Sequence, residues 1–270
     1  MIVFPNCKIN LGLYITGKRA DGYHNIETIF LPLPFYDVLE LMDAQKTGIT
    51  VFGNTIPGRP EDNIVLKAWR LLKKKFPILP PVHFCLLKNI PAGAGLGAGS
   101  ANGAFTLIAL NEKYQLRLSA DQLMHYALQL GSDCPFFIFN KATFASGRGE
   151  IFNAIDLDIS AYKIVIVNPG IHIATPWAFS QAKPAKVPHN LKHIIKEDII
   201  YWKKMITNNF EYPVFLQYPE IEAIKNTLYA NGASFALMSG SGSTVYGLFK
   251  KSISPEFNFP ENYFVRTIPL

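Results

Sequence analysis

Residues 91–104 constrain the chain more than any other stretch. Five of these fourteen residues are glycine and five are alanine, so little side-chain bulk shields the backbone. Successive N–H groups in such a loop can close around an anion. An apolar run at 82–87 predicts a strand before the loop, and apolar residues at helical spacing predict a helix over 101–114. The loop would therefore present free amides and the positive end of a helix dipole to a phosphate group.

Three alternative roles for this loop fit the sequence less well. A Walker A loop requires Gly-Lys-Ser/Thr, and no lysine follows these glycines. Gly93, Gly95 and Ala98 match the dinucleotide pattern G-x-G-x-x-G/A, which also needs a second strand ending in an acidic residue about 20 positions on. Instead, a capping box at 119–122 predicts a second helix that ends at Gly131. A glycine-rich turn without a ligand is disfavoured, since each interior glycine costs about 0.5–1 kcal/mol.

The composition is that of a packed globular protein. Hydrophobic residues make up 49% of the chain. Its 270 residues are enough for one large or two modest domains. The longest apolar run, at 104–110, is far shorter than the roughly 18 residues needed to span a bilayer. The first residues carry no signal-peptide pattern. We therefore expect a cytoplasmic protein.

Charge and cysteine usage narrow the classes of ligand. The formal charge of +6 suits anionic ligands, but the lysine clusters are short and scattered, unlike a nucleic-acid-binding patch. The three cysteines have no C-x-x-C spacing, which argues against disulfides or structural zinc. His189, His193 and Glu197 share a helical spacing but form no H-E-x-x-H motif. We expect no metal-ligating cluster, no nucleic-acid or membrane partner, and a monomer or weak homodimer.

Residues 7–16 alternate between apolar and polar side chains, which predicts a strand. Lys8 and Asn10 share one of its faces. A half-buried strand would simply turn that face to water, so the pattern alone leaves their role open. A polar turn at 17–25 carries Tyr23 and His24, and residues 26–33 predict a second strand. Further strands are expected at 37–42, 49–53, 164–167 and 245–249, a helix at 65–76, and a surface linker at 183–188.

Three segments resemble the motifs of the GHMP kinases (galactokinase, homoserine, mevalonate and phosphomevalonate kinases). Residues 91–102 resemble the family's second motif, P-x-x-x-G-L-G-x-G-S/A-S/A, which wraps the phosphates of ATP without a Walker lysine. Residues 238–243, Met-Ser-Gly-Ser-Gly-Ser, resemble the third motif. The run from Lys8 to His24 resembles the branch that phosphorylates the 2-hydroxyl of 4-(cytidine 5'-diphospho)-2-C-methyl-D-erythritol in non-mevalonate isoprenoid precursor synthesis. The resemblance covers nearly the whole chain, with its motifs in family order.

The resemblance implies an α+β, two-domain GHMP kinase fold with the active site in the cleft between the domains. We place the N-terminal, ATP-binding domain at 1–158 and the C-terminal domain at 159–270. ATP and Mg²⁺ are implied as cofactors. The implied ATP-binding residues are Asn63, Lys88, Pro91, Ala92, Gly93, Ala94, Gly95, Leu96, Gly97, Ala98, Gly99, Ser100 and Ala101. For Asn63, capping of the helix that follows is an adequate alternative.

The implied catalytic aspartate lies in a fourth segment, 131–137. Gly131-x-Asp133-x-Pro135-x-Phe137 matches the family motif that carries the catalytic aspartate. By resemblance, Asp133 orients the acceptor hydroxyl and takes its proton, while Lys8 lies opposite it. From the residues alone, Asp133 is an acidic residue between a helix end and an apolar strand at 136–139, and a turn aspartate would also fit.

The resemblance also implies the substrate-binding residues, which are Asn10, Tyr23, His24, Thr175, Phe179, Gly240 and Ser241. Phe179 would pair with Tyr23 around the cytosine ring, although packing in the core is an alternative for Phe179. Asn209 stands where this branch usually has aspartate, which leaves the role of an acidic group there in doubt. A mevalonate or homoserine type of GHMP kinase would need no Tyr23-His24 pair. A nucleotide-binding module without catalysis would have little need for Lys8 and Asp133 together.

Overall fold

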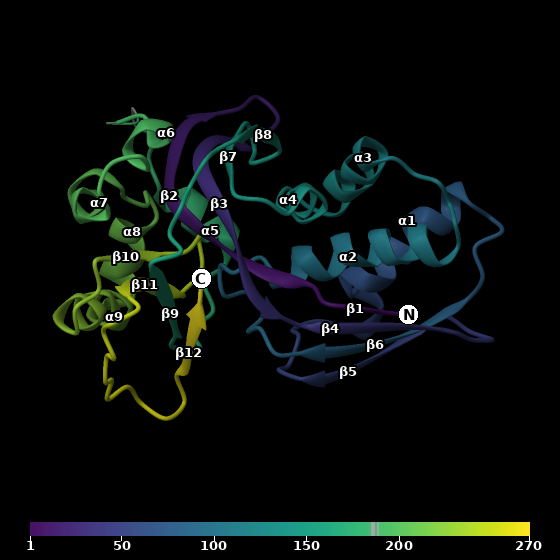
Figure 1. The fold of residues 1–270 in the computed structure, drawn as a ribbon. Coiled ribbons are helices and arrows are strands. Elements are labelled where there is room, and N and C mark those ends of the chain that lie inside the picture. The colour runs from purple at the N-terminus through teal and green to yellow at the C-terminus, as the bar shows by residue number, and fades with distance from the viewer. Residues whose placement is uncertain (185–186, 188) are drawn as a thin grey trace. The chain divides into compact units, whose positions relative to one another are not determined.

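The structure, a computed structural model, describes residues 1–184, 187 and 189–270. The predicted surface linker therefore lies partly outside the described residues. Two compact units divide the chain (Figure 1). Unit 1 comprises Met1–Cys7, Phe35–Ala92 and Gly97–Asn140, and unit 2 comprises Lys8–Pro34, Gly93–Leu96 and Lys141–Leu270.

Unit 1 is a four-stranded sheet with helices packed against one face (Figure 1). The strand order is β1-β4-β6-β5, with β5 parallel to β6 and the other pairs antiparallel. Leu39, Phe84 and Leu86 are fully buried beneath the helices, because alternate strand residues face the same side. The elements are β1 (Ile2–Val3), β4 (Val38–Asp43), β5 (Gly48–Gly53), η1 (Pro60–Asp62), α1 (Ile64–Lys75), β6 (Val82–Lys88), α2 (Ala98–Lys113), α3 (Ala120–Leu130) and α4 (Cys134–Phe139).

Helix starts in unit 1 follow local sequence signals. The Asn63 side chain accepts a hydrogen bond from the Val65 amide and caps α1. Ser119 and Gln122 form the reciprocal capping box of α3, and the helix ends before Gly131. The predicted capping box at 119–122 is confirmed, and of the two residues placed to cap α1, Asp62 and Asn63, it is Asn63 that does so. Such caps satisfy amides that have no partner within the helix, which is why they can be recognised from sequence.

Unit 2 holds two four-stranded sheets. One has the antiparallel order β10-β11-β9-β12, and the other has the order β2-β3-β7-β8. The strands are β2 (Asn6–Lys18), β3 (His24–Tyr36), β7 (Thr143–Ser146), β8 (Ile151–Ala154), β9 (Tyr162–Asn168), β10 (Phe235–Met238), β11 (Val245–Lys250) and β12 (Phe264–Pro269). The helices are α5 (Thr175–Gln181), α6 (Leu191–Ile194), α7 (Ile199–Met205), α8 (Glu211–Gln217) and α9 (Pro219–Ala230).

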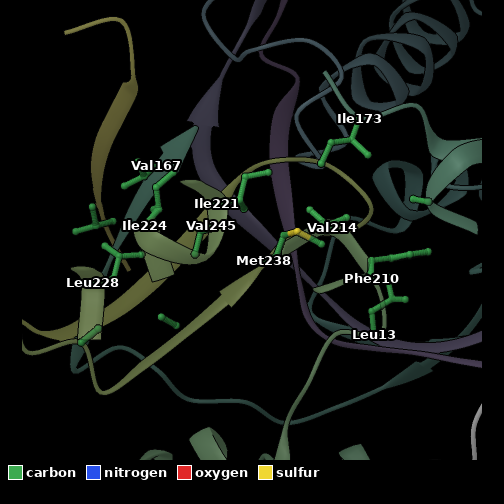
Figure 2. Packing of buried hydrophobic residues seen from close by; sticks show 14 of the residues in the cluster. Leu13, Val167, Ile173, Phe210, Val214, Ile221, Ile224, Leu228, Met238 and Val245 are labelled. Atoms are coloured by element: carbon green, nitrogen blue, oxygen red, sulfur yellow. The ribbon is translucent and has the colours of Figure 1, made fainter. Parts of the chain in front are cut away.

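The core of unit 2 joins β2, the β9–β10–β11 sheet and helices α8 and α9. Figure 2 shows Leu13 of β2 near Phe210 and Val214, and Val167 and Val245 beside Ile224 of α9. These aliphatic and aromatic side chains are almost completely buried. Because burial of apolar surface is the main stabilising term in folding, this cluster holds the strand that carries Lys8 and Asn10 against the third-motif turn.

Strand β2 differs from a surface strand. Residues 6–15 are buried on both faces, and Lys8 and Asn10 are only 2% and 1% exposed. The polar face is therefore not a solvated one, which excludes the half-buried strand that the alternation allowed. Strands β2 and β3 each contribute residues to both units, so the units are discontinuous in sequence. The boundary expected after residue 158 falls inside unit 2, between β8 and β9.

Two segments have a different secondary structure from the one expected. Residues 134–139 form helix α4 instead of a strand, and the prediction there was wrong. A short apolar run does not distinguish a strand from a buried helix, and Pro135 lies in the first turn, where proline favours a helix. No single helix contains His189, His193 and Glu197, since α6 spans only Leu191–Ile194.

Throughout the described part of the chain, every helix falls short of the length and apolar character that crossing a membrane requires.

Candidate active site

The glycine loop combines left-handed residues with a helix start. Gly93, Gly95 and Gly97 have φ angles of 68°, 82° and 69°. Gly97 is the N-cap of α2, and its carbonyl accepts the Ala101 amide at 2.9 Å. A Cβ atom added at Gly99 would meet nothing within 4 Å, so space is open beside the first turn of α2. Alternating backbone conformations and a free helix start are features of anion-binding loops.

Close backbone packing fixes the loop against the third-motif turn within unit 2. A Cβ atom at Gly95 would lie 2.0 Å from the Ser239 carbonyl oxygen, so only glycine fits there. The Ser239 hydroxyl donates to the Gly95 carbonyl at 2.9 Å, and the Thr244 amide donates to the Ala94 carbonyl at 3.3 Å. Residues 94 and 95 of the second motif therefore pack directly on the third-motif turn.

Strand β2 also makes hydrogen bonds to the glycine loop and to the third-motif turn. The Lys8 amide donates to the Leu96 carbonyl at 2.9 Å, and the Asn10 amide donates to the Ser239 hydroxyl at 3.2 Å. The Lys8 ammonium donates to the Asn10 side-chain oxygen at 2.5 Å and lies 4.9 Å from the centre of the Phe30 ring. The structure thus brings Lys8 and Asn10 to the loop residues Gly93–Leu96.

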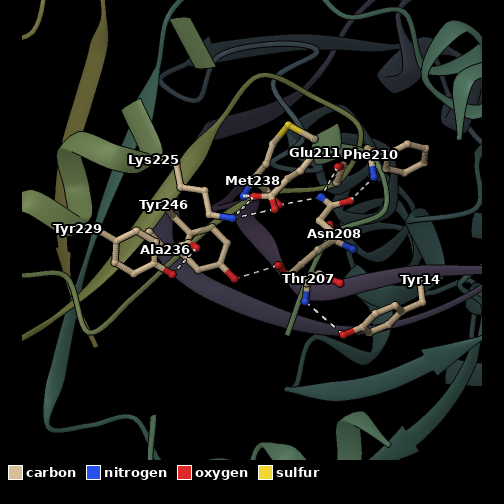
Figure 3. A network of polar contacts seen from close by, with 12 residues as sticks. Tyr14, Thr207, Asn208, Phe210, Glu211, Lys225, Tyr229, Ala236, Met238 and Tyr246 are labelled. Atoms are coloured by element: carbon tan, nitrogen blue, oxygen red, sulfur yellow. Dashed lines mark hydrogen bonds and ion pairs between the residues drawn. The ribbon is translucent and has the colours of Figure 1, made fainter. Parts of the chain in front are cut away.

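A polar network sets the position of the third-motif turn (Figure 3). The Asn208 side chain donates to the Met238 and Gly240 carbonyls, both at 2.8 Å, and accepts the Phe210 amide. Glu211 accepts the Met238 amide and pairs with Lys225 at 2.7 Å. Burial raises the pKa of Glu211, and Lys225 opposes that shift. The turn is consequently held by side chains from 30 residues upstream.

Aromatic and hydroxyl side chains named for substrate binding also lie in unit 2. The His24 and Phe179 rings stack with centroids 5.0 Å apart, and the Arg148 guanidinium lies 3.9 Å from the centre of the Tyr23 ring. The hydroxyls of Thr175 and Ser241 are 3.2 Å apart. Phe179 therefore packs on His24 here, whereas the resemblance pairs it with Tyr23 around a bound base.

Asp133 precedes α4 in unit 1. The next residue, Cys134, is buried and its thiol hydrogen-bonds the Ser100 hydroxyl at the end of the glycine loop. Burial raises the pKa of Cys134 to about 12, so the thiol stays neutral. Its hydrogen bond ties the segment of Asp133 to Ser100. Lys8, which the resemblance places opposite Asp133, belongs to unit 2.

Lys88 and Asn63 have structural partners in unit 1. Lys88 is only 2% exposed, and its ammonium forms an ion pair with Asp37. Burial lowers the pKa of Lys88, and Asp37 opposes that shift. Asn63 caps α1. These contacts favour structural roles for both residues over the nucleotide contacts that the resemblance implies.

Sequence reasoning missed three polar residues. Ser239 was included in the third motif without a role, Arg148 was part of a turn, and Asp37 was only the start of a strand. Their partners lie far away along the chain, so no local spacing signals them. Among the described residues, no three His, Cys, Asp or Glu side chains are grouped closely enough to hold a metal ion.

Comparisons with known proteins match both halves of the chain. The family models for the GHMP kinases N terminal domain and the GHMP kinases C terminal match residues 63–141 and 190–257. A 4-diphosphocytidyl-2-C-methyl-D-erythritol kinase of Bacteroides fragilis is 52% identical over 95% of this chain and 93% of its own length. One of Bacteroides thetaiotaomicron is 49% identical over 97% and 95%.

Solved structures of GHMP kinases have a similar fold. A crystal structure of 4-(cytidine 5'-diphospho)-2C-methyl-D-erythritol kinase superimposes with a TM-score of 0.77 at 30% identity, covering 92% of this chain and 90% of that one. The mevalonate kinase of Methanococcus jannaschii superimposes with a TM-score of 0.68 at 15% identity, covering 100% and 98%. At that identity the second likeness shows the fold alone. The two-domain α+β fold of the GHMP kinases is therefore confirmed.

Proposed function

The chain belongs to the 4-diphosphocytidyl-2-C-methyl-D-erythritol kinases of the GHMP kinase family, and on that premise we propose that it transfers the γ-phosphoryl group of ATP to the 2-hydroxyl of 4-(cytidine 5'-diphospho)-2-C-methyl-D-erythritol. The product would serve non-mevalonate isoprenoid precursor synthesis. The observation that carries the proposal is the Ser239 hydroxyl, which joins Asn10 of the Lys8-x-Asn10 strand to Gly95 of the phosphate loop.

The residues of this chain have distinct parts in the proposed reaction. Phosphoryl transfer needs alignment and charge neutralisation more than covalent help from the protein. The amides of the glycine loop and the start of α2 hold the phosphates of ATP. Asp133 orients the acceptor hydroxyl and receives its proton. Lys8 offsets charge on the transferring group.

Mg²⁺ fits the residues at the end of the loop. This ion keeps several waters and binds through substrate phosphates and one or two protein oxygens, so it needs no cluster of three acidic ligands. The Ser100 hydroxyl, in the first turn of α2, is the protein oxygen that we assign to it. When bound, Mg²⁺ neutralises charge on the β- and γ-phosphates.

The substrate end of the site is assigned to unit 2. Tyr23, His24 and Phe179 supply an aromatic face and a hydrogen-bonding edge for cytosine, a planar base. Asn10, Thr175, Gly240 and Ser241 supply polar groups for the sugar alcohol and its diphosphate. A mevalonate or homoserine kinase would need no such platform, and the Tyr23-His24 pair therefore favours the cytidine substrate over those alternatives.

Product analysis tests the proposal directly. The protein is incubated with ATP, Mg²⁺ and, separately, the cytidine substrate, mevalonate or homoserine, and ADP release is measured. We expect release only with the cytidine substrate, and a new phosphorus resonance coupled to the 2-position of its product. Release with mevalonate or homoserine would assign the chain to another branch, and ATP binding without ADP release with any alcohol would indicate a module without catalysis.

A further inference from the structure

The Asp37 carboxylate in unit 1 accepts hydrogen bonds from four donor groups. It is completely buried and lies just before β4. Its Oδ1 atom accepts the backbone amides of Asn89 and Ile90 at 2.9 and 3.0 Å. These amides belong to the segment between β6 and the glycine loop. One oxygen of Asp37 therefore holds the residues that lead into the glycine loop.

The second oxygen of the carboxylate holds the first turns of α2, which follow the loop. Oδ2 accepts the side-chain amide of Asn102 at 2.9 Å and pairs with the Lys88 ammonium. The same ammonium donates to the Asn102 side-chain oxygen at 3.2 Å. Asn102 lies in α2 one turn beyond Ala98, where the helix starts, and is 1% exposed. The segment of the loop at 91–97 thus has both of its ends attached to one carboxylate.

Stability alone does not account for this cluster. Removing a carboxylate and an ammonium from water costs several kcal/mol each, and well-packed apolar side chains in their place are often equally stable. What apolar side chains cannot supply is an acceptor for the two backbone amides and the Asn102 amide. The directional contacts, all of which lead to the loop, are the property that the charged pair provides.

We propose that Asp37 is a positioning residue for ATP, which holds both ends of the phosphate loop in the shape that receives the triphosphate. Lys88 acts through Asp37: its ammonium balances the buried carboxylate and does not itself reach the nucleotide. A loop held in its binding conformation loses less conformational entropy when the ligand binds, so the cluster raises ATP affinity. The inference rests on the proposed function only in taking ATP as the ligand of the loop.

Two double variants separate positioning from charge burial. Asp37→Asn/Lys88→Met removes both charges but keeps an oxygen that accepts the Asn89 and Ile90 amides. Asp37→Ala/Lys88→Met removes the same charges and that oxygen. Binding of ATP with Mg²⁺ is measured by calorimetry, together with the melting temperature. We expect the alanine double variant to bind ATP about tenfold more weakly than the asparagine one, the loss associated with one or two hydrogen bonds. Equal Kd values would overturn the proposal.

A second pair of variants addresses the loop exit and does not depend on residue 37. Asn102→Leu removes the link from α2 to Asp37 and leaves the ion pair. Thr106→Val is the matched control, because Thr106 is fully buried one turn further on and its hydroxyl donates to the Asn102 carbonyl. We expect a raised Kd for ATP in the leucine variant alone, with an unchanged KM for the alcohol. Equal ATP affinity in both variants would contradict the proposal. Since ATP binding is measured without the alcohol, an error in the proposed acceptor would appear separately, in ADP release by the wild type.

Discussion

The imidazole ring of His24 stacks on the ring of Phe179, with centroids 5.0 Å apart and planes inclined by 23°. Phe179 in turn meets Phe210 of the unit 2 core edge-on at 4.9 Å. The first residue of β3 is therefore connected to the core through an aromatic pair. Tyr23, immediately before it, is 50% exposed and carries the Arg148 guanidinium on one face. The core-anchored ring and the exposed ring should respond differently to substitution.

Tyr23→Ala should raise the KM for the cytidine substrate about tenfold and leave the KM for ATP unchanged, because an aromatic face is lost that ATP does not use. The exposed position predicts little change in stability. Tyr212→Ala, at a residue that is 77% exposed on α8, is the matched control. Steady-state kinetics with each substrate varied in turn gives both constants, and equal effects on both would argue against a cytosine platform.

Asp133→Asn should lower kcat by a factor of about 10²–10⁴, since a positioned base contributes that much to proton transfer. The amide keeps the shape of the side chain, and we expect the fold and the KM for ATP to persist. Asp156→Asn, at an exposed aspartate that precedes β9, should leave kcat unchanged. Single-turnover measurement of phosphoryl transfer makes the comparison, and wild-type kcat in the Asp133 variant would reject its catalytic role.

Lys225→Met should destabilise unit 2 in a pH-dependent way. Burial raises the pKa of Glu211 above its ordinary value of 4.5, and Lys225 opposes that rise. Since folding favours the protonated carboxyl, this contribution to stability is present below the ordinary pKa and is lost as pH rises through the raised one. Without the ammonium the pKa rises further. We expect the variant's deficit in unfolding free energy to grow as pH rises above the ordinary carboxyl pKa of 4.5, towards about 3–5 kcal/mol.

Urea unfolding at each pH measures that deficit. The control is Glu211→Gln/Lys225→Met, which removes both charges and should show a smaller deficit that does not grow as pH rises. A constant deficit in the single variant would show that the Glu211 carboxylate is not the group responsible.

Thiol reactivity should distinguish the three cysteines. Cys7 and Cys134 are buried, and Cys85 of β6 is partly accessible. The thiolate is the reactive form, and burial raises the pKa of Cys134 to about 12, so it should resist alkylation near neutral pH. A colorimetric thiol reagent should titrate one group in the native protein and all three in denaturant. Cys85→Ser should abolish the native signal, and a remaining fast thiol would contradict this assignment.

Sequence reasoning succeeded where partners are close along the chain. Asn63 and the Ser119–Gln122 pair cap their helices within three residues, so composition and order were sufficient. It failed at α4, where packing, and not periodicity, decides between helix and strand. Asp37 was overlooked because its partners lie 51 to 65 residues away. Contacts of that kind are set by the tertiary fold, and a resemblance to a family transfers only the residues that its motifs contain.

Asn209 stands where the resemblance leads us to expect aspartate, and its contacts show what the position requires. Its side-chain oxygen accepts the Ile15 backbone amide at 2.8 Å, and the backbone amide of Asn209 donates to the Leu13 carbonyl at 2.9 Å. Asparagine and aspartate both supply such an oxygen, so the position needs an acceptor and not a charge. Asn209→Asp should therefore keep kcat/KM within about twofold, whereas Asn209→Leu should lose about 1–3 kcal/mol of stability by leaving the Ile15 amide without its acceptor. Thermal unfolding and steady-state kinetics on both variants make the comparison, and a large change in kcat/KM for the aspartate variant would show that the charge at this position matters.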